Sequence, residues 1–202
     1  MRNAACCAAR ICGLAAMTLG ISAFHHDEKS VRYALDGDHT SVMWSVNHFG
    51  FSHPSGKFTD VQGVVELNEQ HPENSAVSVV IGTKSVLSGV AKLDEHLRSK
   101  DFFDADQFPE ATFISDKVTP SGPTAAKVSG KLTLHGITRP LVLDVVMNKS
   151  GENPVSHKKV AGFSAKTVIK RSDYGMTYAL PGVSDEVQLD IESEAVLDES
   201  GK

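Results

Sequence analysis

Residues 128–147 read VSGKLTLHGITRPLVLDVVM, and this stretch decides the fold of the chain. Apolar residues and glycine occupy alternate positions on both sides of Gly136: Val128, Gly130, Leu132 and Leu134 before it, and Leu141, Leu143, Val145 and Met147 after it. A period of two residues is typical of strands with one face in water and the other in a core. Gly136 separates the two runs where a tight turn is needed. The stretch therefore predicts two antiparallel strands joined by a short turn.

The same alternation recurs along most of the chain. It is present in residues 41–47, 76–81, 163–170 and 187–192, and residues 61–67 form a further apolar run. Turn signals such as Asp36-Gly37, Glu73-Asn74 and Gly151-x-Asn153-Pro154 separate these runs. Consecutive strands with short connections lie antiparallel and side by side. About eight long strands are expected, the number at which a closed barrel can just hold a small ligand.

One segment departs from the strand pattern. Residues 90–99 read VAKLDEHLRS, and Leu93 and Leu97 lie four positions apart, which is a helical spacing. An aromatic turn, Asp101-Phe102-Phe103-Asp104, follows directly. The sequence thus predicts an all-β domain with one short helix.

The first residues have the order of a secretory signal peptide. Arg2 and Arg10 supply positive charge, residues 11–23 are uncharged and largely apolar, and charged residues follow from Asp27 onward. This apolar run is shorter than the roughly 20 residues that span a bilayer, which disfavours an uncleaved anchor. We expect residues 1–23 to be a signal peptide cleaved near Ala23, and residues 24–202 to form a single domain in the periplasm or outside the cell.

This removal would change the chemistry of the chain. Cys6, Cys7 and Cys12 all precede Ala23, so the mature chain would have no disulfide, thiolate metal site or cysteine nucleophile. It would carry 18 basic and 25 acidic residues, a net charge of −7. The sequence has no basic cluster either. This balance argues against nucleic acid as a partner and against adhesion to an anionic membrane surface.

No catalytic or metal site is expected from the motifs. The sequence lacks a Gly-x-Ser-x-Gly elbow and a glycine-rich phosphate loop. Nine histidines are spread along the chain without the tight local spacing of a zinc site. They are His25, His26, His39, His48, His53, His71, His96, His135 and His157. Composition alone also favours a solid core over a ligand tunnel, because most inward apolar residues simply fill a core.

Ten motifs in a fixed order resemble the YceI-like family of exported, lipocalin-like barrels, which are described as polyisoprenoid-binding proteins. They cover the chain from about Tyr33 to Leu197. The motifs are Tyr33-Ala-Leu-Asp36, His39-Thr-Ser-Val42, Val46-Asn-His-Phe-Gly50, Gly56-Lys-Phe58 with Gly63, Ser85-Val86, Leu93 through Asp104, Phe108-Pro109, Thr112-Phe-Ile-Ser115, Gly130 through Pro140, and Arg171 through Met176. Tyr174 stands where the family often has Phe, and the loop 177–183 is short, which would alter one mouth of the barrel.

The resemblance implies an eight-stranded antiparallel barrel with a helix near one end and a long isoprenoid, quinone or other lipid in its pore. It reverses the preference for a solid core. No cofactor is required. Leu93, Leu97, Phe102 and Phe103 would plug or gate one end. The expected pore-lining residues are Val42, Trp44, Val46, Val79, Ile81, Leu93, Leu97, Phe102, Phe103, Phe113, Leu132, Leu134, Leu143, Val145, Phe163 and Leu189.

Two alternatives remain open at this point. One is an enzyme, a hydrolase or isomerase acting on a prenyl or acyl substrate with His96 and Asp94 at the barrel mouth. The other is a quinone-linked partner of a membrane redox or stress system. A transient membrane or membrane-protein contact and a homodimer, the commonest oligomer, are both compatible with the sequence.

Overall fold

The computed structural model describes residues 30–199, so the predicted signal peptide lies outside the described residues. Eleven strand segments form one antiparallel sheet. Their bounds are β1 Val31–Leu35, β2 Ser41–His48, β3 Ser55–Phe58, β4 Val61–Leu67, β5 Ala76–Gly82, β6 Val86–Leu87, β7 Glu110–Pro120, β8 Ala125–Leu134, β9 Ile137–Glu152, β10 Lys159–Lys170 and β11 Val183–Leu197. The one α-helix, α1, spans Ala91–Arg98, and four short 3₁₀ turns complete the described part.

These segments combine into eight strands around a barrel. The 3₁₀ turn Gly37–His39 divides one strand into β1 and β2, residues 59–60 divide another into β3 and β4, and Thr83–Ser85 separates β5 from β6. β1 pairs with β4 and β2 with β3. β11 closes the ring by pairing with both β1 and β2. The predicted eight-stranded antiparallel barrel with one short helix is therefore confirmed.

The alternation in residues 128–147 determines which side chains face inward. Val128, Leu132 and Leu134 of β8 are buried, while Lys131 between them is exposed. β8 pairs with β9 through the predicted turn, where His135 and Gly136 both have positive φ. Because each strand repeats this in–out order, the eight inner faces together enclose an apolar interior.

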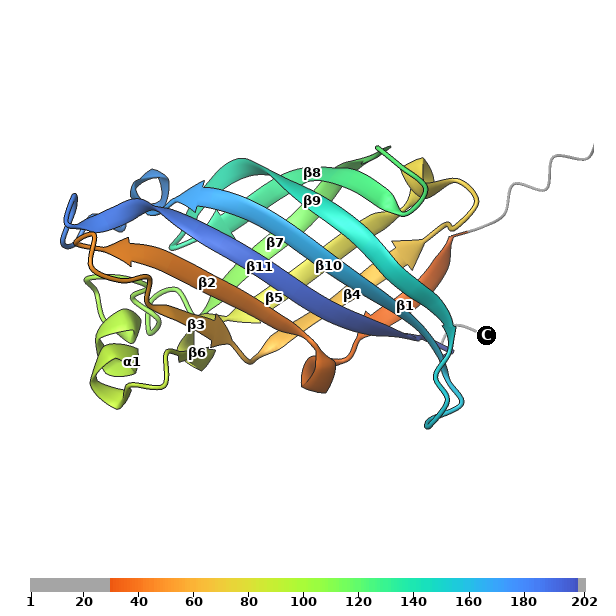
Figure 1. Ribbon diagram of the computed structural model, residues 1–202, viewed down its shortest axis with the longest axis horizontal. Helices are drawn as coiled ribbons and strands as arrows, with labels where there is room; N and C mark the ends of the chain where they lie inside the picture. The colour runs from red at the N-terminus through yellow and green to blue at the C-terminus, as the bar shows by residue number, and fades with distance from the viewer. Residues whose placement is uncertain (1–29, 200–202) are drawn as a thin grey trace, which may run out of the picture.

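The long barrel has two different ends (Figure 1). At the helix end, α1 lies beside the loop between β2 and β3 and the segment that precedes β11. At the hairpin end, the β9–β10 hairpin projects past the start of β1 and the end of β11. Core residues at the hairpin end are Tyr33, Leu67, Ala161 and Ala195, all buried. None of the helices formed by residues 30–199 is long and apolar enough to cross a bilayer.

Candidate functional site

Two apolar cavities lie end to end inside the barrel. The larger, of about 630 Å³, is at the helix end and is lined by residues of α1, β2, β11 and the adjoining loops. The smaller, of about 220 Å³, reaches the turns 68–75 and 120–124 at the opposite end. Val42, Ile81, Leu132 and Leu189 line both cavities, so these four residues form a waist between them. The larger volume falls within the usual range for small-molecule sites, roughly 300–1,000 Å³.

The structure brings all sixteen predicted pore residues to these cavities. The larger cavity is lined by Val42, Trp44, Val46, Ile81, Leu93, Leu97, Phe102, Phe103, Leu132, Leu134 and Leu189. The smaller cavity is lined by Val79, Phe113, Leu143, Val145 and Phe163, together with the four waist residues. Whether a ligand touches them stays a prediction. The period of two explains the common location of the twelve that lie in strands, whereas Leu93, Leu97, Phe102 and Phe103 come from α1 and the turn after it.

Other lining residues were missed by the sequence analysis, for two reasons. Val187 and Ile191 flank Leu189 on the same face of β11, so the alternation could have found them. Phe49 and Tyr178 come from loops, where no periodicity marks which side chain turns toward the interior. His48, at the end of β2, also lines the larger cavity.

Trp44 is wedged against the backbone of β3. It pairs with Gly56 in the sheet, and a Cβ added to Gly56 would lie 2.5 Å from Cζ2 of the indole. The side chain is buried, and its Nε1 has no hydrogen-bond acceptor among the described residues. A buried N–H without a hydrogen-bond partner is costly, and this nitrogen also has almost no accessible surface toward the cavity.

Arg171 holds the segment that forms one side of the mouth of the larger cavity. Its guanidinium donates four hydrogen bonds of 2.9 Å, to the backbone carbonyls of Met176, Tyr178, Val183 and Ser184. Arg171 is only 4% exposed, and burial lowers its pKa below the ordinary value. All four of these partners are backbone carbonyls, and they lie in the loop 176–178 and at the start of β11.

The polar residues of α1 have separate partners. The carboxylate of Asp94 accepts hydrogen bonds from the backbone N–H and the hydroxyl of Ser88, at 2.6 and 2.5 Å, and these lower the pKa of Asp94. His96 Nε2 lies 2.9 Å from the carboxylate of Asp101. Arg98 donates to the backbone carbonyl of Asp94 rather than to its carboxylate. Asp94 thus fixes the approach to α1, and Asp94 and His96 have different partners.

The rings of His96, Phe102 and Tyr178 join α1 to the loop that precedes β11. His96 contacts Phe102 and Tyr178 edge to face, with centroids 5.0 and 4.9 Å apart, and Phe102 lies 5.5 Å from Tyr178. Phe103, deeper in the barrel, meets Phe58 edge to face at 5.3 Å. All five line the larger cavity. The residues predicted to gate one end therefore lie at the helix end, and their gating role stays a prediction.

Comparison with known proteins identifies this arrangement. The model of the YceI-like domain matches residues 33–195 of the chain. The chain belongs to the YceI-like family. The resemblance that the ten motifs indicate is thereby confirmed.

Relatives of this YceI-like protein match over nearly their whole length. The chain is 35% identical over 186 residues to a "UPF0312 protein" of Pseudomonas fluorescens strain SBW25, covering 91% of this chain and 96% of the relative. It is 36% identical to a UPF0312 protein of Pseudomonas putida strain W619, with 90% and 95% covered.

Solved structures share the barrel. The Campylobacter jejuni YCEI protein has a TM-score of 0.67 at 31% identity, with 76% of this chain and 90% of that chain covered. BcnA of Burkholderia cenocepacia has a TM-score of 0.72 at 23% identity, over 79% and 98%. A polyisoprenoid binding domain from Saccharophagus degradans has a TM-score of 0.61 at 17% identity, over 83% and 99%. The last two show a common fold.

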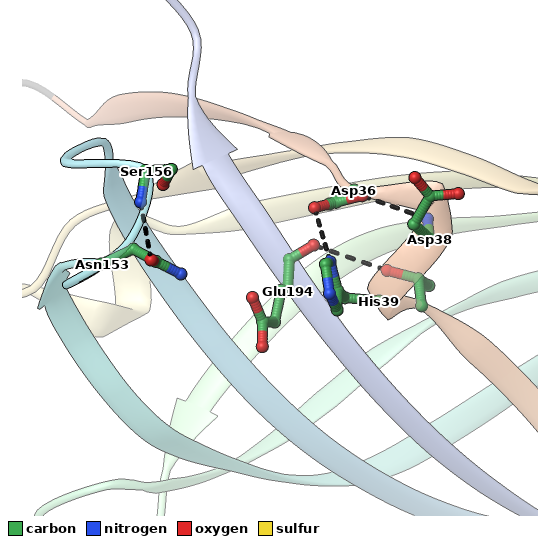
Figure 2. A network of polar contacts seen from close by, with 7 residues as sticks. Asp36, Asp38, His39, Asn153, Ser156 and Glu194 are labelled. Atoms are coloured by element: carbon green, nitrogen blue, oxygen red, sulfur yellow. Dashed lines mark hydrogen bonds and ion pairs between the residues drawn. The ribbon is translucent and has the colours of Figure 1, made fainter.

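A third hollow of about 360 Å³ lies on the outside of the YceI-like barrel, between the Gly37–His39 turn and the β9–β10 hairpin. Figure 2 shows hydrogen bonds within the turn on one side of it and within the hairpin on the other. Asp36 accepts hydrogen bonds from the backbone N–H of Asp38 and from His39, and Asn153 accepts one from the backbone N–H of Ser156. These contacts are ordinary turn chemistry. Within residues 30–199, no group of three or more His, Cys, Asp or Glu side chains is placed to hold a metal ion.

Proposed function

We propose that this YceI-like protein binds and carries a long apolar molecule, such as a polyisoprenoid, a prenyl quinone or a fatty-chain lipid, inside its barrel. The observation that carries the proposal is the pair of apolar cavities meeting at a shared waist. Each buried CH₂ group contributes about 0.8 kcal/mol, so a chain that fills both cavities needs few polar contacts to bind. A strand of ten residues spans roughly 33 Å, enough for several isoprene units in line.

The polar groups suggest how such a ligand would lie. The side chains of His48 and His96 both line the wider cavity at the helix end. The narrower cavity is lined mostly by aliphatic side chains and Phe113 and Phe163. We therefore place an oxygen-bearing head group in the wider cavity and the tail beyond the waist.

The similarity to the Saccharophagus degradans domain supports the ligand class in a limited way. That domain is named for polyisoprenoid binding, and it has the same barrel fold. We extend the ligand class to this chain because its own interior has two adjoining cavities with an apolar lining.

We also propose that the protein acts outside the cytoplasm, after removal of residues 1–23. The support is the charged start, the apolar run and the small residues near Ala23. Intact mass of the protein recovered from periplasmic and culture fractions tests this. A mass that corresponds to a start near Phe24 is expected, and a full-length chain confined to the cytoplasm would contradict it.

Native mass spectrometry of the purified protein tests the ligand directly. A lipid held in the barrel should co-purify as a discrete added mass, and solvent extraction should release a molecule with a long apolar chain. Trp44 is the only tryptophan, so adding a prenyl quinone to delipidated protein should change its emission and raise the melting temperature. The absence of an added mass, together with unchanged Trp44 emission and an unchanged melting temperature, would contradict the proposal.

A further inference from the structure

Two loops at the helix end have an unusual composition. Residues 47–56 and 174–184, the mouth loops, contain no Lys, Arg, Asp or Glu, although 22% of the whole chain is charged. At that frequency their combined length would hold about five charged residues. The β9–β10 hairpin at the other end carries Lys149, Glu152, Lys158 and Lys159 over a shorter span. The absence of charge is therefore a property of these two loops, whereas α1 beside them carries Lys92, Glu95 and Arg98.

The mouth loops are one surface. Phe49 donates its backbone N–H to the carbonyl of Gly182 at 2.7 Å, and Val183 pairs with His48 in the sheet. Phe49, Tyr178 and their neighbours also line the larger cavity. In Figure 1 both loops lie together beside α1. Their apolar surface thus continues without a break into the interior of the barrel.

Large apolar side chains on this surface face solvent. Phe51 is 90% exposed, Phe49 56% and Tyr178 48%. Phe51 is held there by backbone bonds: its N–H reaches the carbonyl of His48 at 3.0 Å, and His48 donates to Ser52 at 2.9 Å. The side chain of Asn47 accepts the N–H of Gly50 at 2.8 Å. A fixed turn that presents a phenylalanine to water marks an interaction site.

We propose that the mouth loops dock onto the surface of a lipid bilayer, with Phe51 entering the apolar boundary. This rests on the proposed function, because a bilayer is where a long apolar ligand resides when it is not in the barrel. Aromatic side chains are favoured at membrane interfaces. A mouth closed against the bilayer would let the ligand pass between the membrane and the cavity without exposing its chain to water.

The charge pattern points to a neutral bilayer surface. The chain has a net charge of −5, and the mouth loops offer no Lys or Arg to anionic head groups. They also place no charged side chain where it would have to lose its water. Docking should therefore occur on zwitterionic phosphatidylcholine vesicles and should depend little on salt.

Flotation of the full-length protein with pure phosphatidylcholine vesicles tests the proposal. Phe51→Ser should weaken vesicle binding about tenfold, because burial of a Phe side chain would be lost. Val155→Ser is the matched control, since Val155 is 87% exposed at the tip of the opposite hairpin and should leave binding unchanged. Phe51→Trp should retain vesicle binding. The intact mass of each variant should differ from that of the parent protein only by the substitution, which ensures that all of them begin at the same residue.

The docking proposal would be overturned by unchanged vesicle binding of Phe51→Ser or by an equal loss of binding in Val155→Ser. Binding that requires anionic lipid and disappears in salt would also overturn it. A change of Phe51→Ser from dimer to monomer without an effect on vesicle binding would instead assign the surface to a second copy, which also overturns it. Native mass spectrometry separates the two proposals. A protein that holds lipid but ignores vesicles refutes docking alone, whereas vesicle binding by a protein with an empty barrel refutes the carrier function alone.

Discussion

At the hairpin end, the cavity is narrower, and Ala161 pairs directly with Ala195 beside Tyr33, all three buried. At the helix end, the cavity is wider, and the segment before β11 depends on one buried cation, Arg171. The first end is stabilised by packing within the sheet, although the Tyr33 hydroxyl is buried without a hydrogen-bond partner among the described residues. The second is stabilised by hydrogen bonds from Arg171 to two carbonyls of the loop and to two at the start of β11. The two ends thus differ in what holds the backbone: strand pairing and packing at one, and a single side chain at the other.

Arg171→Met should have the largest effect on stability and should act at the helix end alone. Four backbone carbonyls would lose a charged donor, and hydrogen bonds of this kind contribute about 1.5–3 kcal/mol each. We expect the free energy of unfolding to fall by at least about 3 kcal/mol. Chemical denaturation measures this, with the exposed Arg139→Met as the control. Hydrogen exchange should accelerate in residues 176–184 but not in β9 and β10. Uniform acceleration would contradict the claim that Arg171 acts at the helix end alone.

Val42→Phe should separate the two cavities, because Val42 belongs to the waist. A ring at this position would block the tail from the narrower cavity, and each excluded CH₂ group costs about 0.8 kcal/mol. Affinity for a long prenyl chain should fall about a hundredfold, while a short chain that fits the wider cavity should bind as before. Met43→Phe, on the outer face of the same strand, should change neither. Titrations followed by Trp44 emission decide the outcome, and an equal loss for both chain lengths would contradict a two-part tunnel.

Gly56→Ala and Gly162→Ala compare the packing of the two ends. An added methyl at Gly56 meets the carbonyl of Leu87 and the Trp44 ring at 2.5 Å, whereas at Gly162 the nearest atoms are 3.9 Å away. We expect Gly56→Ala to cost about 1–3 kcal/mol through overpacking. Gly162→Ala should leave the free energy of unfolding unchanged or raise it by up to about 1 kcal/mol, because a glycine inside a strand is less stable than an alanine. Urea denaturation of both variants checks the difference, and similar costs would show that the helix end can adjust.

The smallest expected effect concerns pH and the Asp36–His39 pair. The hydrogen bond between their side chains, 2.8 Å long, raises the pKa of His39 above 6.5 and lowers the pKa of Asp36 below 3.8. The stabilisation by His39 is therefore complete below pH 6.5 and is lost as the pH rises through its raised pKa. The stabilisation by Asp36 is complete above pH 3.8 and is lost as the pH falls through its lowered pKa. His39→Gln should lower the melting temperature slightly at pH 5.5 and less at pH 8.5; a larger effect at pH 8.5 would contradict this.

The sequence predicted the barrel because an inner face repeats every second residue. Val42, Trp44 and Val46 could be assigned to the interior for that reason alone, and all three line the larger cavity. The alternation does not apply to loops, so the sequence could not predict that Tyr178 lines the larger cavity. The role of Arg171 was also out of reach, because backbone carbonyls that need a donor leave no trace in the sequence. Interruptions at 37–39, 59–60 and 83–85 depend on how strands bend around the barrel, and these three breaks divide eight expected strands into eleven segments.

The closing strand β11 has a consequence for how the chain acquires its structure. It pairs with β10, β2 and β1, and its last contact joins Leu197 to Tyr33 across almost the whole described chain. All-β folds with such distant pairings fold slowly, on the scale of milliseconds to seconds. Until β11 arrives, two strand edges and the apolar interior stay open, and open edges invite aggregation. The barrel therefore becomes a closed container only when its final residues are in place, so a chain truncated before Val183 should fail as a unit rather than leave a shorter working barrel.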